Sequence, residues 1–127
     1  SLKIPFWWNA GLTRESIIKA KRSVMLKFAR AMVEAVHSIK TDKEGSKTIF
    51  SKNLRLTDPE GLERAYRAYT AVFPENLMPA PDGVKTMLDD LAPRNPKAAS
   101  ADPKSFVDMS FVQELEKEGF IKQLYKR

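Results

Sequence analysis

The sequence predicts a mainly α-helical single domain with about five helices, one of them long and N-terminal, and one short strand. Residues 14–41 carry apolar side chains at helical spacing, without Pro or Gly. Shorter helical patterns follow between proline-rich connectors. The chain has 127 residues, which suffice for one core but not for two domains. We therefore expect one domain over residues 1–127, with a strand segment at 1–12 and helices over 13–127.

The N-terminal segment, SLKIPFWWNAGL over residues 1–12, is expected to form the short strand. Side chains that are adjacent in a strand point to opposite faces, so Trp7 and Trp8 cannot both enter the same core. Each tryptophan has roughly 150–250 Å² to bury. Trp7, Trp8 and Asn9 are therefore the candidate ligand-binding residues. The alternative interpretation is that the tryptophans pack in a core and that Asn9 lies where the strand ends.

The long helix is expected over residues 14–41, with Thr13 as its N-cap. Lysine and arginine side chains mark its polar face. We expect the later helices to pack against its apolar stripe, which consists of Ile17, Ile18, Met25, Phe28, Met32, Val36 and Ile39, widened by Val24, Val33 and Ala35.

Two S/T-x-x-E spacings predict the starts of the second and third helices. The first spacing begins at Thr41 and places a helix start near Asp42. The second begins at Thr57 and places Pro59 in a first helical turn, where proline is tolerated. Apolar residues over 62–73 then follow at i, i+3, i+4 and i+7 spacing, which supports the third helix.

The fourth and last helices are expected over residues 82–91 and 109–118, with Asp108 as the N-cap of the last. Proline-rich connectors at 74–81 and 92–103 separate the helices. Gly119 fits the left-handed position that commonly ends a helix, and residues 121–125 are expected to form a final docked turn.

The residues offer little chemistry for catalysis or for metal binding. There is no cysteine, and the only histidine, His37, lies at the edge of the apolar stripe, where we expect a structural role. Asp89 and Asp90 are adjacent, and the glutamates at 114, 116 and 118 alternate, so neither group shares one helix face. No phosphate-binding loop, nucleophile elbow or zinc motif occurs. We expect no enzyme activity, no cofactor and no metal.

Charge and hydropathy narrow the possible partners. The net charge is +6, but basic and acidic residues are interleaved, which favours a solvated surface over a nucleic-acid interface. A helix-turn-helix near Thr41 would need residues 43–53 as its recognition helix, and their composition is not typical of one. No run of about 18 apolar residues occurs, so we expect no membrane span, and the chain shows no signal peptide.

From Met25 onward the sequence resembles the C-terminal part of ABC-transporter substrate-binding proteins, in the group that includes nitrate, sulfonate, taurine and thiamine-precursor binders. The resemblance rests on FARAMVEAVHSIKTDKEGS, LRLTDPEGLERAYRAYTAVFPE, GVKTMLDDLAPRNPKA and ADPKSFVDMSFVQELEKEGFIKQLY, at residues 28–46, 54–75, 83–98 and 101–125. These are helix-packing patterns, so they identify a family better than a ligand. The family usually has a proline-containing break where this chain reads KAKR at 19–22, and two family helices are therefore expected to be fused here.

The resemblance implies that the chain is the last part of a type 2 periplasmic-binding-protein α/β fold, in which two lobes close on a small molecule. It places the segment equivalent to residues 4–13 near the cleft or hinge, and thus Trp7, Trp8 and Asn9 near the ligand. For the full-length parent it implies an ABC permease as partner and a periplasmic or extracytoplasmic location.

Helices without their sheet would expose apolar faces, so we expect this chain alone to form a homo-oligomer, with the long helix or the tryptophan segment exchanged between copies. A free-standing helical module for protein interaction or dimerisation is the alternative function. A small nucleic-acid binder is a third, which the basic pI of about 9.6 keeps open.

Overall fold

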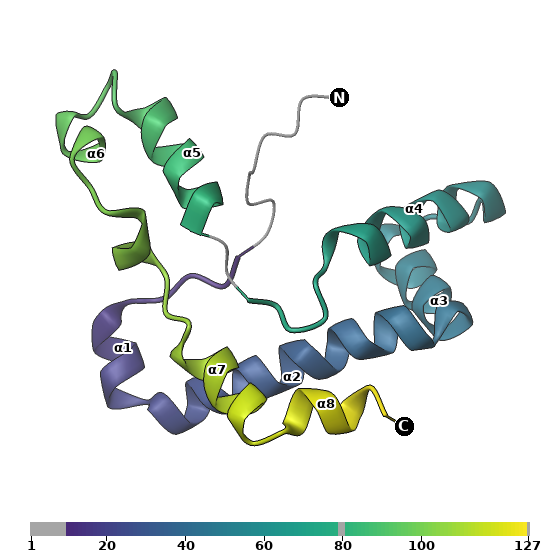
Figure 1. Cartoon of the computed structure of the whole chain (residues 1–127). Helices are drawn as coiled ribbons and strands as arrows, with labels where there is room; N and C mark the ends of the chain where they lie inside the picture. The colour runs from purple at the N-terminus through teal and green to yellow at the C-terminus, as the bar shows by residue number, and fades with distance from the viewer. Residues whose placement is uncertain (1–9, 79–80, 127) are drawn as a thin grey trace. The chain divides into compact units, whose positions relative to one another are not determined.

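The computed structural model describes residues 10–78 and 81–126 (Figure 1). These residues form helices and irregular connections and contain no strand, which confirms the mainly helical fold class. The strand predicted over 1–12 falls mostly on residues 1–9, outside the described residues, and Ala10–Leu12 are not in a strand. The described elements are α1 (Glu15–Ala20), α2 (Arg22–Thr41), α3 (Lys43–Leu54), α4 (Pro59–Val72), α5 (Pro81–Leu91), α6 (Pro96–Ala99), the 3₁₀ helix η1 (Pro103–Phe106), α7 (Ser110–Lys117) and α8 (Phe120–Leu124).

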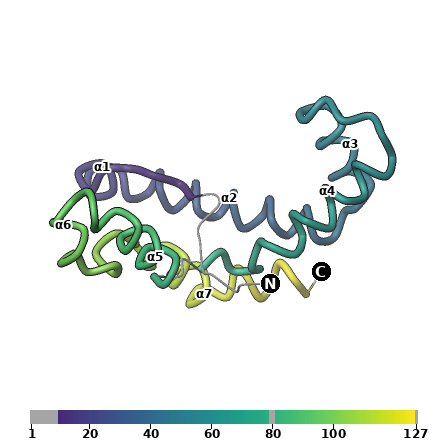
Figure 2. Tube along the Cα trace, turned by 90° about the horizontal axis from the view of Figure 1, so that it is seen from above, coloured from purple at the N-terminus to yellow at the C-terminus, as the bar shows by residue number. Residues whose placement is uncertain are grey.

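The prediction of one unbroken helix over residues 14–41 is wrong, because the backbone leaves the helical conformation at Lys21 (φ −131°, ψ 39°). Neither Pro nor Gly marks this break. Glu15 forms an ion pair with Lys19 inside α1, whereas Lys19 and Arg22 are like charges three residues apart, a pairing that disfavours a continuous helix. The expectation that two helices are fused at residues 19–22 is therefore wrong as well. Figure 2 shows that α2 continues from there as one long helix.

Helices α3 and α4 start within one residue or two of the predicted positions, but their caps differ from the prediction. Asp42 and Asp58 provide the capping carboxylates, rather than the threonines before them. The backbone N–H of Gly45 donates to Asp42 Oδ1 at 2.9 Å, and that of Gly61 donates to Asp58 Oδ2 at 2.6 Å. A Cβ added at Gly45 would overlap Asp42 Oδ2, so glycine at the third helical position lets the carboxylate approach the backbone.

The chain divides into two compact units, and the first comprises Ser1–Arg22 and Met78–Ser110. Its buried hydrophobic cluster consists of Val84 and Leu88 of α5 and Ala98 of α6, with Ala101 and Val107 packed against them. The connector predicted over 92–103 therefore contains structure that sequence reasoning missed. Side chains of Asn95 and Asp102 cap α6 and η1, respectively.

The second unit comprises Ser23–Leu77 and Phe111–Arg127. Its buried apolar residues come from three helices and are Val33, Val36, Phe111, Val112, Leu115 and Ile121. Helix α2 contacts the C-terminal segment through Arg30, whose guanidinium lies 4.4 Å from the centre of the Phe120 ring and 2.7 Å from Glu118 Oε2. Helices α3 and α4 lie side by side in Figure 1 and Figure 2, and the rings of Phe50 and Tyr69 are 5.1 Å apart.

The C-terminal helices follow the prediction closely. The backbone N–H of Ser110 donates to Asp108 Oδ1 at 2.9 Å, so Asp108 caps the start of α7 as expected. Gly119 adopts the expected left-handed conformation, with φ of 73°. The predicted docked turn is α8, and its residue Ile121 is buried.

Candidate functional site

The three residues chosen from the sequence as ligand contacts, Trp7, Trp8 and Asn9, lie outside the described residues. Their assignment to a ligand site stays a prediction.

His37 occupies a structural position in the second unit. Its half-buried ring meets the Tyr125 ring edge-on, with ring centres 4.8 Å apart. The Tyr125 hydroxyl is buried and has no hydrogen-bond partner among the described residues. Burial raises the pKa of Tyr125, and the nearby negative charge of Glu75 raises it further. This ring pair packs the C-terminal segment against α2.

The acidic residues form ion pairs rather than a metal site. Asp89 lies 2.7 Å from Lys85 Nζ and Asp90 lies 3.1 Å from an Arg94 nitrogen, each pair one helical turn apart. Within residues 10–78 and 81–126, no group of three or more histidine or carboxylate side chains is placed to hold a metal ion. Over the same ranges, no helix is both long and apolar enough to cross a membrane.

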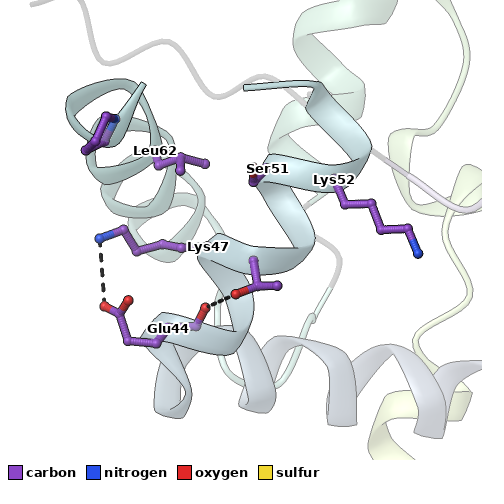
Figure 3. A pocket seen from close by; sticks show the side chains of 7 residues that line it. Glu44, Lys47, Ser51, Lys52 and Leu62 are labelled. Carbon is purple, nitrogen blue, oxygen red and sulfur yellow. Dashed lines mark hydrogen bonds and ion pairs between the residues drawn. The ribbon is translucent and has the colours of Figure 1, made fainter. Parts of the chain in front are cut away.

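A shallow pocket between α3 and α4 is lined by Glu44, Lys47, Thr48, Ser51, Lys52, Pro59 and Leu62. Figure 3 shows that its polar side chains do not converge, because Lys47 extends toward Glu44 while Lys52 points away from both. Lys47 Nζ is 3.7 Å from Glu44 and 3.2 Å from Glu63. The Thr48 hydroxyl already donates to the Glu44 carbonyl at 2.9 Å. We do not assign a ligand to this pocket.

Beside this pocket, Glu63 of α4 joins the two helices through an ion cluster. Its carboxylate lies 2.9 Å from Lys43 and 3.2 Å from Lys47 on α3, and 3.1 Å from Arg67 on its own helix. Hydrogen bonds from Lys43, then Lys47 and Arg67, lower the pKa of Glu63 from 4.5 to about 2. The cluster is a structural cross-link, because its three cations are all directed at one carboxylate.

The most distinctive surface is a second apolar face on α2, which we call the outer face. It consists of the exposed residues Val24, Phe28, Ala31, Met32 and Ala35. Successive helical residues turn by about 100°, so Val24, Phe28, Ala31 and Ala35 gather on one side of the helix and Val33 points to the other, while Met32 lies at the edge of the set, one turn before Val36. Val33 and Val36 are 0% and 2% exposed, whereas Val24, Phe28 and Met32 are 55%, 50% and 40% exposed.

The outer face differs from the single apolar stripe that the sequence predicted for this helix. Phe28 and Met32 belong to the same predicted stripe as Val36, but they are 50% and 40% exposed whereas Val36 is 2% exposed, so only part of that stripe is covered. The signal was present in the 4-3-4 spacing of residues 24, 28, 31 and 35. A helix that is apolar on two sides is typical of one that packs between two layers.

Comparisons with known protein families, curated proteins and solved structures found no match for this chain. The outer face is therefore interpreted from its own chemistry. It carries neither a titratable group nor a hydroxyl, so it suits packing against another apolar surface.

Proposed function

We propose that this chain is the C-terminal segment of a solute-binding protein that captures a small molecule for an ABC transporter. The proposed family comes from the sequence resemblance of residues 28–125. The exposed apolar side chains support the proposal. Among the described residues, eleven large hydrophobic side chains are exposed, against nine buried hydrophobic residues.

Those exposed side chains are distributed over both units. In the first unit, Met87 and Leu91 of α5 are 39% and 44% exposed, and Phe106 is 59% exposed. In the second unit, Ile49 and Val72 are 58% and 62% exposed. Helices that cover a sheet present such faces to it, so helices whose sheet is built from other residues would leave them open.

In this proposal the described helices buttress the first lobe of the parent protein. Trp7, Trp8 and Asn9 contact the ligand where the chain passes the cleft. The parent shifts from open to closed because the ligand makes contacts with both lobes only in the closed state. The proposal involves no catalytic step.

The test is ligand binding by the complete gene product that contains this chain. Calorimetry with nitrate, an alkanesulfonate, taurine and a thiamine-precursor pyrimidine is expected to identify one ligand. Trp7→Ala or Trp8→Ala should then weaken its Kd by about tenfold or more, since truncating an aromatic anchor residue of a binding site costs about 2 kcal/mol or more. Phe106→Ala is the control, because it removes an exposed aromatic side chain outside the predicted contact segment.

Two results would contradict this function. One is a gene whose start codon lies directly before Ser1, because the two lobes would then have no source. The other is a complete product that binds none of the four ligands.

A free-standing helical dimerisation module is the second candidate. The observation that favours it is the outer face of α2, whose apolar residues follow the spacing of a helix-to-helix seam.

A further inference from the structure

We propose that the outer face of α2 binds the same face of a second copy of this chain, with the two helices antiparallel. This inference deepens the second candidate function and is independent of ligand capture. It concerns the chain of residues 1–127 on its own.

The spacing of the outer face is that of a two-heptad coiled-coil seam. Val24, Phe28, Ala31 and Ala35 alternate by four, three and four residues, as the inward positions of paired helices do. Met32 extends the seam on one side. All five residues are exposed, so the seam has no occupant among the described residues of its own unit.

The sizes of the seam residues select the antiparallel orientation. Large side chains occupy the N-terminal half of the seam, and alanines occupy the C-terminal half. In an antiparallel pair, Phe28 of each copy faces Ala31 of the other, and Val24 faces Ala35. Large residues then fill the space that small ones leave. A parallel pair would instead place Phe28 against Phe28 and Ala31 against Ala31.

The charges beside the seam select the same orientation. Lys27 and Glu34 are seven residues apart, so they lie on the same flank of α2, and both are exposed. Neither has an ion-pair partner within residues 10–78 and 81–126. When two copies run antiparallel, equivalent flanks face each other, and Lys27 of each copy meets Glu34 of the other. In a parallel pair the opposite flank, which carries Met25 and Met32, would face Lys27 and Glu34 instead.

The seam is short, and this sets the expected affinity. Residues 24–35 span roughly 16 Å of helix. Five side chains per copy bury less than the standard 1,200–2,000 Å² of a stable complex. We therefore expect a reversible dimer with a Kd on the order of 10 µM.

Sedimentation velocity over protein concentrations from about tenfold below to tenfold above that Kd tests for the dimer. Phe28→Asp places a charge at the centre of the seam and should weaken the Kd by about thirtyfold or more. Phe106→Asp is the matched control, because Phe106 is an exposed phenylalanine in the other unit, at 59% exposure against 50% for Phe28. The control should change the Kd by less than about twofold. Far-UV circular dichroism checks that both variants keep their helices.

Charge exchange tests the orientation. Lys27→Glu alone places two glutamates opposite each other at both ends of the seam, and Glu34→Lys alone does the same with two lysines. Each should weaken the homodimer by roughly tenfold. An equimolar mixture of the two variants should regain dimerisation, because every facing pair is then of opposite charge. Without that recovery, the antiparallel assignment is wrong.

Cysteine cross-linking gives an independent readout, because the chain contains no cysteine. In a Val24→Cys/Ala35→Cys variant, the two thiols of one helix are roughly 16 Å apart and cannot bridge each other. Mild oxidation should give a covalent dimer whose disulfides join residue 24 of one copy to residue 35 of the other. Disulfides between equivalent positions would overturn the antiparallel pairing.

Other occupants of the outer face would also overturn the proposal. A chain that stays monomeric at all concentrations would show that the outer face does not bind a second copy. Protection of the outer face only in a longer gene product would show that another part of that product covers it. A dimer that Phe28→Asp leaves unchanged would place the interface elsewhere, for example on the segment with Trp7 and Trp8. Failure of the ligand test leaves each of these readouts unaffected, so the two proposals fail separately.

Discussion

Leu115→Ala should destabilise the second unit far more than the same substitution at an exposed site. Leu115 of α7 is 0% exposed and is, with Val33, among the largest fully buried side chains. Removing its three outer carbons loses about 2.4 kcal/mol of transfer free energy. The cavity adds about 1 kcal/mol, because the surroundings relax only in part. The free energy of unfolding should therefore fall by about 3 kcal/mol, more than a hundredfold in the unfolding equilibrium.

Urea denaturation at one fixed protein concentration measures this loss, since the concentration must be held constant if the chain dimerises. Leu54→Ala is the matched control because Leu54 is 49% exposed and lies at the end of α3 in the same unit. The control should change the free energy of unfolding by less than about 1 kcal/mol. Equal losses at the two sites would refute the reasoning, because Leu115 would then not lie in a core.

Three further predictions concern charge and backbone geometry. The pKa of Glu63 falls from 4.5 to about 2 on folding, so its contribution to stability should be present above pH 4.5 and be lost as the pH falls toward 2. Glu63→Gln should make the melting temperature depend less on pH over that range. If the slope of melting temperature against pH were unchanged, the ion cluster would be contradicted. Gly119→Ala should cost about 1 kcal/mol because φ is 73°, with Gly119→Asn costing less; equal melting temperatures for Ala and Gly would argue against this conformation. Asp42→Ala should cost about 1 kcal/mol in the natural chain but almost nothing in a Gly45→Ala background, where Cβ already displaces the carboxylate. If the losses in unfolding free energy from Asp42→Ala and Gly45→Ala were additive, the Asp42 cap would still form when residue 45 is alanine.

Local signals in the sequence predicted the helices that carry their own caps and apolar period. The starts near Asp42 and Pro59, the cap at Asp108 and the left-handed Gly119 are all determined within a few residues, so they can be read without knowing the tertiary structure. These features account for most of α3, α4, α7 and α8.

The errors arose where tertiary context or competing local effects decide the structure. No Pro or Gly signals the break at Lys21. Helix α6 and η1 were hidden by proline-rich composition, although Asn95 and Asp102 supply their caps. Periodicity showed that α2 is amphipathic, but it could not show which of its two apolar faces would find a partner within the chain.

The division into units has a consequence for the order in which the chain acquires structure. Each unit combines two stretches that are distant in sequence, Ser1–Arg22 with Met78–Ser110 and Ser23–Leu77 with Phe111–Arg127. Residues 23–77 would therefore emerge from the ribosome well before the residues that cover Val33 and Val36. Their apolar surface should remain exposed until Phe111, Val112, Leu115 and Ile121 have been synthesised. Loss of residues 111–127 would then leave the second unit without most of its interior, however complete the rest of the chain.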